Sequence, residues 1–153
     1  MEPDLAILVT GAARVVADRL GAAVERAGVD DMRTPYGFVI RALADGDRTL
    51  TDIAALLAVS KQAAIKVIDE MEERGFVERH ADPSDRRSKL LRLTAKGRRV
   101  RKAALAESHT LERELRRRRG DREIDAMRGA LLDLLERHGA LDQARAGRSR
   151  ALW

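Results

Sequence analysis

The stretch Asp82–Arg87 constrains the fold most, because it places a tight turn between two short apolar runs. Asp and Pro suit the first two positions of a β-turn. The flanking runs, Phe76–His80 and Lys89–Leu93, have the length of short strands. The pattern therefore predicts a β-hairpin that carries Arg86 and Arg87 just beyond the tip of its turn.

Two short helices are predicted immediately before this hairpin. Thr51 is expected to cap the first, and Ala58–Val59 to form a tight turn after it. Ser60 is expected to cap the second helix, which runs to about Arg74 and ends at Gly75. Two short helices joined by a tight turn and followed by a hairpin form the winged helix-turn-helix pattern.

The second of these helices is amphipathic. Its apolar stripe, expected to face the core, consists of Ala64, Val67, Ile68 and Met71. The opposite arc holds Gln62, Ile65, Lys66, Asp69 and Glu73, with Lys61 and Ala63 at its flanks. The first half of this arc is basic and the second half is acidic, so the positive N-terminal end of the helix is the end suited to phosphate.

The side chains of this arc also fit base recognition. Gln62 can read adenine in the major groove, and Lys61 or Lys66 can reach guanine or a phosphate. Ile65 can touch a thymine methyl group or lie at the rim of the core. A Ser-capped helix with two lysines also occurs in many helical proteins, so the short helix before it and the hairpin after it are what favour DNA reading.

Two helices are predicted before this region. Residues 4–27 repeat apolar side chains at steps of three and four, and Gly28 suits the position just past a helix end. The next helix is expected to take Thr34 as its N-cap and Pro35 as its first residue. Its inner face is predicted to hold Phe38, Val39, Ala42 and Leu43.

Two more helices are predicted after the hairpin. Residues 95–119 form a long helix that breaks at Gly120, and the last helix begins at about Asp121. The last helix carries a seam spaced by threes and fours: Ile124, Met127, Leu131, Leu134, His138 and Leu141. Such a seam packs against another helix, either within the chain or in a second subunit.

Basic charge is concentrated in one part of the chain. The net charge is +5, and residues 94–119 alone carry ten basic and three acidic side chains. A basic segment raises affinity for phosphate through counterion release. A solvated helix surface is the alternative interpretation. Arg116–Arg119 are expected to be remote from the groove-reading helix and either solvated or paired with acidic groups.

Several classes of protein are disfavoured by the composition. The chain has no cysteine, which leaves no disulfide, thiol switch or thiolate metal site and favours the cytoplasm. No 18-residue apolar run and no basic leader segment is present. His80, His109 and His138 are far apart, so no metal site is expected. Without a nucleotide-binding or hydrolase motif, we expect neither a cofactor nor an enzyme.

The chain resembles the MarR family of bacterial transcription regulators over about residues 4–141. The resemblance is carried by V-S-K-Q-A-A-I-K-V-I-D-E-M-E-E-R-G-F-V-E-R at 59–79 and D-P-S-D-R-R-S-K-L-L-R-L-T-A-K-G at 82–97. It implies a mainly α fold with a small β-wing, in which the winged helix-turn-helix lies between dimerisation helices of an obligate homodimer. The implied segments are 1–33 and 95–146 for dimerisation, 34–94 for DNA binding and 147–153 as a basic tail.

The resemblance also implies roles for individual residues. By motif position, the major-groove surface is made of Lys61, Gln62, Ala63, Ile65 and Lys66, and Ser60 at the helix cap is counted with these DNA-binding residues. In the wing, Arg87 matches the arginine that enters the minor groove, Asp85 matches the group that braces the wing, and Arg86 would meet a phosphate. Ala63, Ile65 and Lys66 depart from the side chains common in the family, so the operator sequence is not transferable.

The implied function is a regulator, in most cases a repressor, that binds a palindromic operator in double-stranded DNA and is released by a small anionic or phenolic ligand. Arg14, Tyr36 and Phe38 are candidates for lining an effector cavity. Taken singly, Phe38 fits the core and Arg14 the surface. The alternative function is a winged-helix protein-interaction module with only weak, non-specific DNA binding. The roles of His109, His138 and Trp153 stay open.

Overall fold

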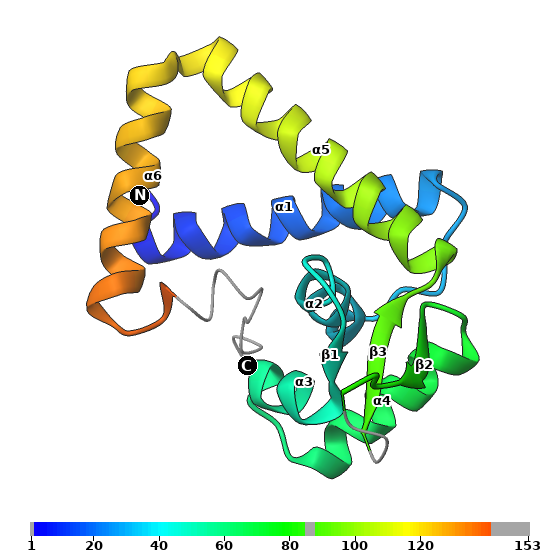
Figure 1. The fold of residues 1–153 in the computed structure, drawn as a ribbon. Coiled ribbons are helices and arrows are strands. Elements are labelled where there is room, and N and C mark those ends of the chain that lie inside the picture. The colour runs from blue at the N-terminus through cyan, green and yellow to red at the C-terminus, as the bar shows by residue number, and fades with distance from the viewer. Residues whose placement is uncertain (1, 85–87, 142–153) are drawn as a thin grey trace.

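The computed structural model describes residues 2–84 and 88–141, which form a mainly α-helical molecule with a small sheet (Figure 1). The elements are α1 Leu5–Arg26, α2 Thr34–Ala42, β1 Arg48–Thr49, α3 Leu50–Leu57, α4 Lys61–Glu73, β2 Val77–Ala81, β3 Lys89–Leu93, α5 Ala95–Arg119 and α6 Asp121–Arg137. The expected mainly α fold with a small β-wing is confirmed. The predicted tail lies outside the described residues.

Two predicted helix starts are wrong. Arg33, in extended conformation, is the N-cap of α2, and Thr34 is already its first residue. Helix α3 is capped by Thr49, because Asp52 stands three residues later and completes a capping box that Thr51 cannot form. The Thr49 hydroxyl oxygen accepts from the Asp52 N–H at 3.1 Å, and the Asp52 carboxylate accepts from the Thr49 N–H at 2.9 Å.

The inner face of α2 is rotated slightly from the prediction. Val39, Ala42 and Leu43 are buried as expected, whereas Phe38 is only half-buried. Tyr36 and Ile40 are buried as well. The shift follows from the register of α2 on its neighbours, because Tyr36 packs its ring against Phe76 with the ring centroids 5.5 Å apart.

The sheet has the order β1-β3-β2 and is antiparallel throughout. Strands β2 and β3 form the predicted hairpin, with Val77 opposite Leu93 and Ala81 opposite Lys89. The two-residue strand β1 was not predicted from the sequence. At the turn, the Asp82 N–H donates to the Ser88 carbonyl at 3.2 Å, and the Asp82 carboxylate accepts from the Ser84 N–H at 2.8 Å.

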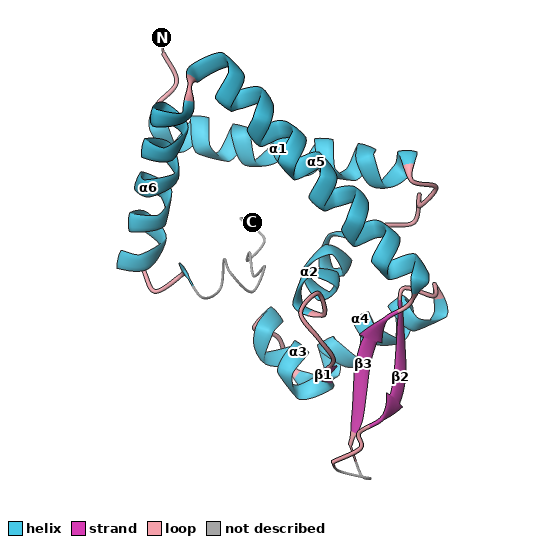
Figure 2. Cartoon of the chain, turned by 45° about the horizontal axis from the view of Figure 1, so that its top comes forward, coloured by secondary structure: helices cyan, strands magenta, loops and turns pink. Residues whose placement is uncertain are grey.

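The main core lies where α2, α3 and α4 meet the sheet and the first turns of α5 (Figure 2). Its largest fully buried side chains include Tyr36, Ile53, Ile68, Met71, Phe76 and Leu91. Apolar burial of this extent is the main stabilising contribution to a small domain. The core therefore fixes the position of α4, whose other face is left exposed.

Helices α1, α5 and α6 extend above this core, with α6 turned back from the end of α5 (Figure 1). Helix α1 crosses α5, and the Arg19 guanidinium on α1 donates to Glu107 at 2.7 Å and Glu114 at 2.6 Å on α5. These hydrogen bonds, that of Glu114 first, raise the pKa of Arg19 and keep it charged. Within α6, Ile124 is the one buried residue.

Candidate nucleic-acid interface

Helix α4 begins as the sequence predicts. Ala58 adopts a left-handed conformation with a φ of 53°, which turns the chain sharply between α3 and α4. The Ser60 side-chain oxygen then accepts from the Ala63 N–H at 3.2 Å. Such a cap typically contributes about 1 kcal/mol to the stability of a helix. Gly75, with a φ of 71°, follows the other end of the helix.

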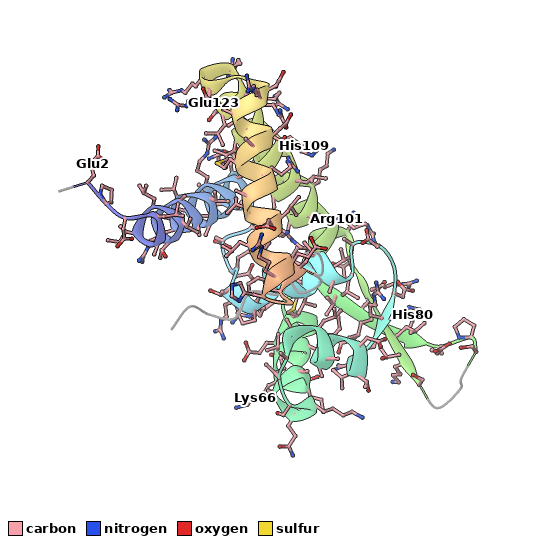
Figure 3. All side chains as sticks on the ribbon, turned by 90° about the vertical axis from the view of Figure 1, so that its left-hand side faces the viewer. Glu2, Lys66, His80, Arg101, His109 and Glu123 are labelled. Carbon is pink, nitrogen blue, oxygen red and sulfur yellow. The ribbon has the colours of Figure 1, made fainter. Side chains whose placement is uncertain are left out.

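One face of α4 is buried, and the first half of the other face is exposed. Ala64, Ile68 and Met71 have no exposed surface. The residues of this region that were predicted to bind DNA are all exposed: Ser60, Lys61, Gln62, Ala63, Ile65 and Lys66. Figure 3 shows Lys66 at the lower edge of the molecule, pointing away from the long helices. The structure thus brings these six residues together on one surface, whereas Asp85, Arg86 and Arg87 lie outside the described residues.

The acidic second half of α4 is bound by the wing. Arg79 on β2 donates from its guanidinium to Asp69 at 2.6 Å and also to Glu72, and its backbone N–H donates to Glu72 at 3.2 Å. Burial acts to lower the pKa of Arg79, but Asp69 and Glu72 outweigh it and raise that pKa. The sequence analysis did not single out Arg79. An arginine in the strand that follows a helix with an acidic second half could have indicated an ion pair between the two elements.

One ion pair and one hydrogen bond also hold β2 in place. Glu78 accepts from the Arg92 guanidinium at 2.6 Å across the hairpin, where the two residues are register partners. His80 lies 2.7 Å, Nε2 to Oδ2, from Asp47 in the segment before β1. Adjacent residues of a strand point to opposite faces of the sheet. Strand β2 is therefore tied to β3, to α4 and to the segment before β1.

The capping box of α3 carries an electrostatic component. The hydroxyl and the backbone N–H of Thr49 lower the pKa of Asp52, and Arg48 adds to this effect. A carboxylate that accepts backbone hydrogen bonds is favoured in its charged form. Since α3 packs against α4, this cap helps to hold the exposed helix at a fixed angle.

Much of the basic charge on α5 is already used within the chain. Lys96 donates to Asp31 at 3.0 Å and lies over the Phe76 ring at 4.1 Å from the centroid. Arg98 and Arg101 donate to the carbonyls of Leu93 and Ala44, at 2.5 Å and 2.7 Å. These side chains fix the beginning of α5 on the wing and on the end of α2. The predicted pairing of Arg116–Arg119 with acidic groups is seen for Arg116 and Arg119.

The three effector candidates lie in different environments. Tyr36 is buried and its hydroxyl donates to Glu70 at 3.0 Å. Burial, and then this hydrogen bond, raise the pKa of Tyr36. Phe38 is half-buried and Arg14 is exposed on α1. An open surface hollow of about 490 Å³ lies along α5 and is lined by Thr110, Arg113, Arg116 and Arg117 rather than by any of the three.

Two other features are absent from residues 2–84 and 88–141. These residues contain no cluster of three His, Cys, Asp or Glu side chains placed to hold a metal ion, and both His109 and His138 are exposed. None of the helices in these residues has both the length and the apolar composition needed to cross a membrane.

Known sequences match the part of the chain that contains α4. A family model described as MarR family covers residues 30–88, from before α2 to the wing. The transcriptional regulator HosA of Escherichia coli O111:H- is 36% identical over 87 residues. The match covers 55% of this chain and 63% of HosA, so the chain spans less than two thirds of the length of this relative.

Solved structures show the same fold over most of the chain. A transcriptional regulator of the MarR family from Rhodococcus sp. RHA1 has 26% identity and a TM-score of 0.60, covering 86% of this chain and 91% of that one. A mutant of MepR from S. aureus, bound to an oligodeoxyribonucleotide, has 20% identity and a TM-score of 0.61. The match covers 88% of this chain and 98% of that one. Residues 30–88, which include α3 and α4, therefore match the MarR family of transcription regulators, and the chain shares its fold with solved proteins of that family.

Proposed function

We propose that the chain is a cytoplasmic, sequence-specific DNA-binding regulator that represses transcription as a homodimer on a palindromic operator. The exposed face of α4 carries this proposal. It presents two lysines, a glutamine and Ile65, which is 36% exposed, on a helix whose opposite side packs into the core. A rigid helix with free polar side chains near its N-terminus suits the major groove. The bound DNA of the MepR mutant is consistent with this use of the fold.

In this proposal the polar residues of α4 have separate roles. Lys61 and Lys66 contact phosphates or guanine, and Gln62 reads adenine through its paired donor and acceptor. Ala63 and Ile65 supply apolar contact to thymine methyl groups. By motif position, Arg87 enters the minor groove, Asp85 braces the wing and Arg86 meets a phosphate.

Exposed apolar side chains on α1 and α6 support the homodimer. On α1 these are Leu5, Ile7, Leu8, Val9 and Val15, and on α6 they are Met127, Leu131, Leu132 and Leu134. An apolar surface spread over two helices is unfavourable in water and is typical of an interface. A second copy would cover it and place two α4 helices about one turn of DNA apart, roughly 34 Å.

Release by a small anionic or phenolic ligand is the part of the proposal that rests on the similarity to the MarR family. Arg14 is exposed and can bind an anion, whereas the Tyr36 hydroxyl already donates to Glu70. Adding a small phenolic carboxylate to the protein–DNA complex tests this part. Release of DNA at concentrations that leave the fold intact supports it, and an unchanged complex over a panel of such ligands contradicts it.

The main experiment selects the preferred duplex from a random pool and measures its affinity at several salt concentrations. We expect a palindromic consensus and a steep loss of affinity with salt, because phosphate contacts release counterions. Lys66→Ala should reduce the salt slope by about one. Lys102→Ala on α5 removes the same charge away from α4 and is the matched control.

The competing function gives a different result in the same experiment. A winged-helix module that binds proteins would return no consensus, and its weak DNA binding would not separate operator from scrambled duplex. The two lysine variants would then behave alike. An unchanged salt slope for Lys66→Ala with a clear consensus would instead remove Lys66 from the phosphate contacts.

A further inference from the structure

Helix α6 projects from the molecule as an arm with little support from its own chain. Ile124 near its start is 6% exposed, whereas Met127 and Leu134 further along are 47% and 51% exposed. Figure 1 shows α6 turning back from α5 to form the third side of a triangle with α1 and α5. The apolar seam of α6 thus lacks a full partner among the described residues, so the direction of the arm must be set at its base.

The base of the arm is a cluster of charged side chains around the break at Gly120, which has a φ of 86°. We call it the corner cluster: Glu112 and Arg116 on α5, and Asp121, Asp125 and Arg128 on α6. The Arg116 guanidinium lies 2.9 Å from Glu112, 3.1 Å from Asp121 and 2.8 Å from Asp125. Arg128 reaches back to Glu112 at 2.8 Å.

The geometry of this cluster suits it to fix an angle between helices. A guanidinium is planar and offers several N–H donors in fixed directions, so binding carboxylates on two helices restrains both. Hydrogen bonds from Arg116 and then Arg128 lower the pKa of Glu112, which stays charged at neutral pH. Besides the corner cluster, the ion pair between Arg119 and Glu123 is the other one joining α5 to α6 among the described residues.

We propose that the corner cluster, with Arg116 at its centre, sets the direction of α6 so that its apolar face meets a second copy of the chain. This inference rests on the proposed homodimer. A second copy is the fitting partner because α1 and α6 of the same chain expose apolar side chains and can cover each other across a two-fold axis. Arg116 is a positioning residue in this scheme, since it acts through the orientation of α6.

The expected size of the effect follows from the strength of surface ion pairs. Each exposed pair contributes little by itself, but a network that shares one guanidinium restrains the arm more than an isolated pair does. Without it, α6 must be ordered when the subunits associate, and that entropy weakens association. We expect loss of Arg116 to raise the dimer dissociation constant about tenfold.

Sedimentation equilibrium of the full chain tests the proposal with three variants. Arg116→Met removes the charge and keeps the aliphatic stem, and it should raise the dissociation constant about tenfold. Arg116→Lys keeps the charge but lacks the planar guanidinium, so it should give an intermediate dissociation constant. Arg117→Met is the matched control, because Arg117 is adjacent on α5 and forms no ion pair with another described residue.

The salt dependence of the dimer dissociation constant distinguishes loss of these ion pairs from a general loss of stability. Ion pairs at the surface are screened over about 8 Å at 0.15 M salt. The difference in dissociation constant between the wild-type chain and Arg116→Met should therefore shrink as salt increases. A difference that is independent of salt would overturn the ionic explanation. Equal weakening by Arg117→Met would overturn the assignment to the corner cluster.

The outcomes also separate this inference from the proposed function. A wild-type chain that stays monomeric at all concentrations contradicts the homodimer itself. A wild-type dimer with an unchanged constant in Arg116→Met contradicts only the role of the corner cluster. If circular dichroism shows that Arg116→Met has lost helical content, Asp125→Asn replaces it as the test. This variant removes one partner of Arg116 and should also raise the dimer dissociation constant. No change in that variant counts against the proposal.

Discussion

Arg79 on β2 and Asp69 on α4 are joined by an ion pair of 2.6 Å, so the wing and the proposed recognition helix are bound to each other directly. We expect Arg79→Gln to lower DNA affinity about tenfold. The wing would lose its fixed position on α4, and Asp69 and Glu72 would be left uncompensated near the DNA. Fluorescence anisotropy with the selected duplex measures the effect.

Two variants separate position from charge at this contact. Arg79→Lys keeps the charge but cannot bind Asp69 and Glu72 through a planar fork, so it should also bind DNA weakly. Arg92→Gln removes the same charge from β3, where Arg92 pairs with Glu78 rather than with α4. A loss for Arg92→Gln as large as that for Arg79→Gln would show that charge alone is responsible.

Local signals explain why so much of α4 could be predicted from the sequence. Its beginning depends on the hydroxyl of Ser60, its end on Gly75, and its buried face on apolar spacing. Each of these acts within a few residues along the chain. The hairpin was predictable for the same reason, because Asp82 and Pro83 favour a turn whatever lies around them.

The contacts that were not predicted depend on residues distant in the sequence. Strand β1 is two residues long and exists because Arg48 and Thr49 pair with Leu91 and Leu90 on β3. The tie of Arg79 to α4 likewise needs the hairpin to fold back on the helix. The error at Thr51 was different, because the capping box of Thr49 and Asp52 is visible in the sequence and competes with it.

Gly97 in the first turn of α5 is expected to be irreplaceable. A Cβ atom at this position would lie 2.3 Å from the Phe76 carbonyl oxygen, which also accepts from the Thr94 N–H at 3.1 Å. That oxygen belongs to the backbone and cannot move without disturbing the start of the wing. Gly97→Ala should lower the free energy of unfolding by about 1–3 kcal/mol in urea denaturation.

Gly37 on α2 is the matched control for this substitution. Nothing lies within 4 Å of a Cβ atom built there, and its φ is ordinary for a helix. Gly37→Ala should therefore raise the free energy of unfolding by about 0.5–1 kcal/mol, since alanine favours the helix. Equal stability of Gly97→Ala and Gly37→Ala would contradict the close approach of α5 to Phe76.

The cap of α3 should make stability depend on acid pH. Hydrogen bonds from Thr49 lower the pKa of Asp52 in the folded chain. Its contribution is thus fully present above the ordinary pKa of aspartate, about 4, and is lost as the pH falls through the lowered value. At pH 7, Asp52→Ala should reduce the free energy of unfolding by about 0.5–1 kcal/mol.

Asp52→Ala also tests how the contribution of this cap depends on pH. The difference in unfolding free energy between the wild-type chain and Asp52→Ala should narrow steadily below pH 4. Urea titrations at a series of pH values measure it. A difference that stays constant into strong acid would mean that the Asp52 carboxylate does not stabilise the cap through its charge.

Gln62 provides the sharpest test of base reading, because its amide is exposed near the N-terminus of α4 and is neutral. Gln62→Ala should change the selected consensus more than it changes overall affinity, with a loss of about 1–3 kcal/mol confined to duplexes that carry the recognised adenine. Lys66→Ala should instead weaken all duplexes about equally. Duplex selection with both variants distinguishes these outcomes. An unchanged consensus for Gln62→Ala would remove Gln62 from base recognition, while leaving phosphate contacts by the lysines intact.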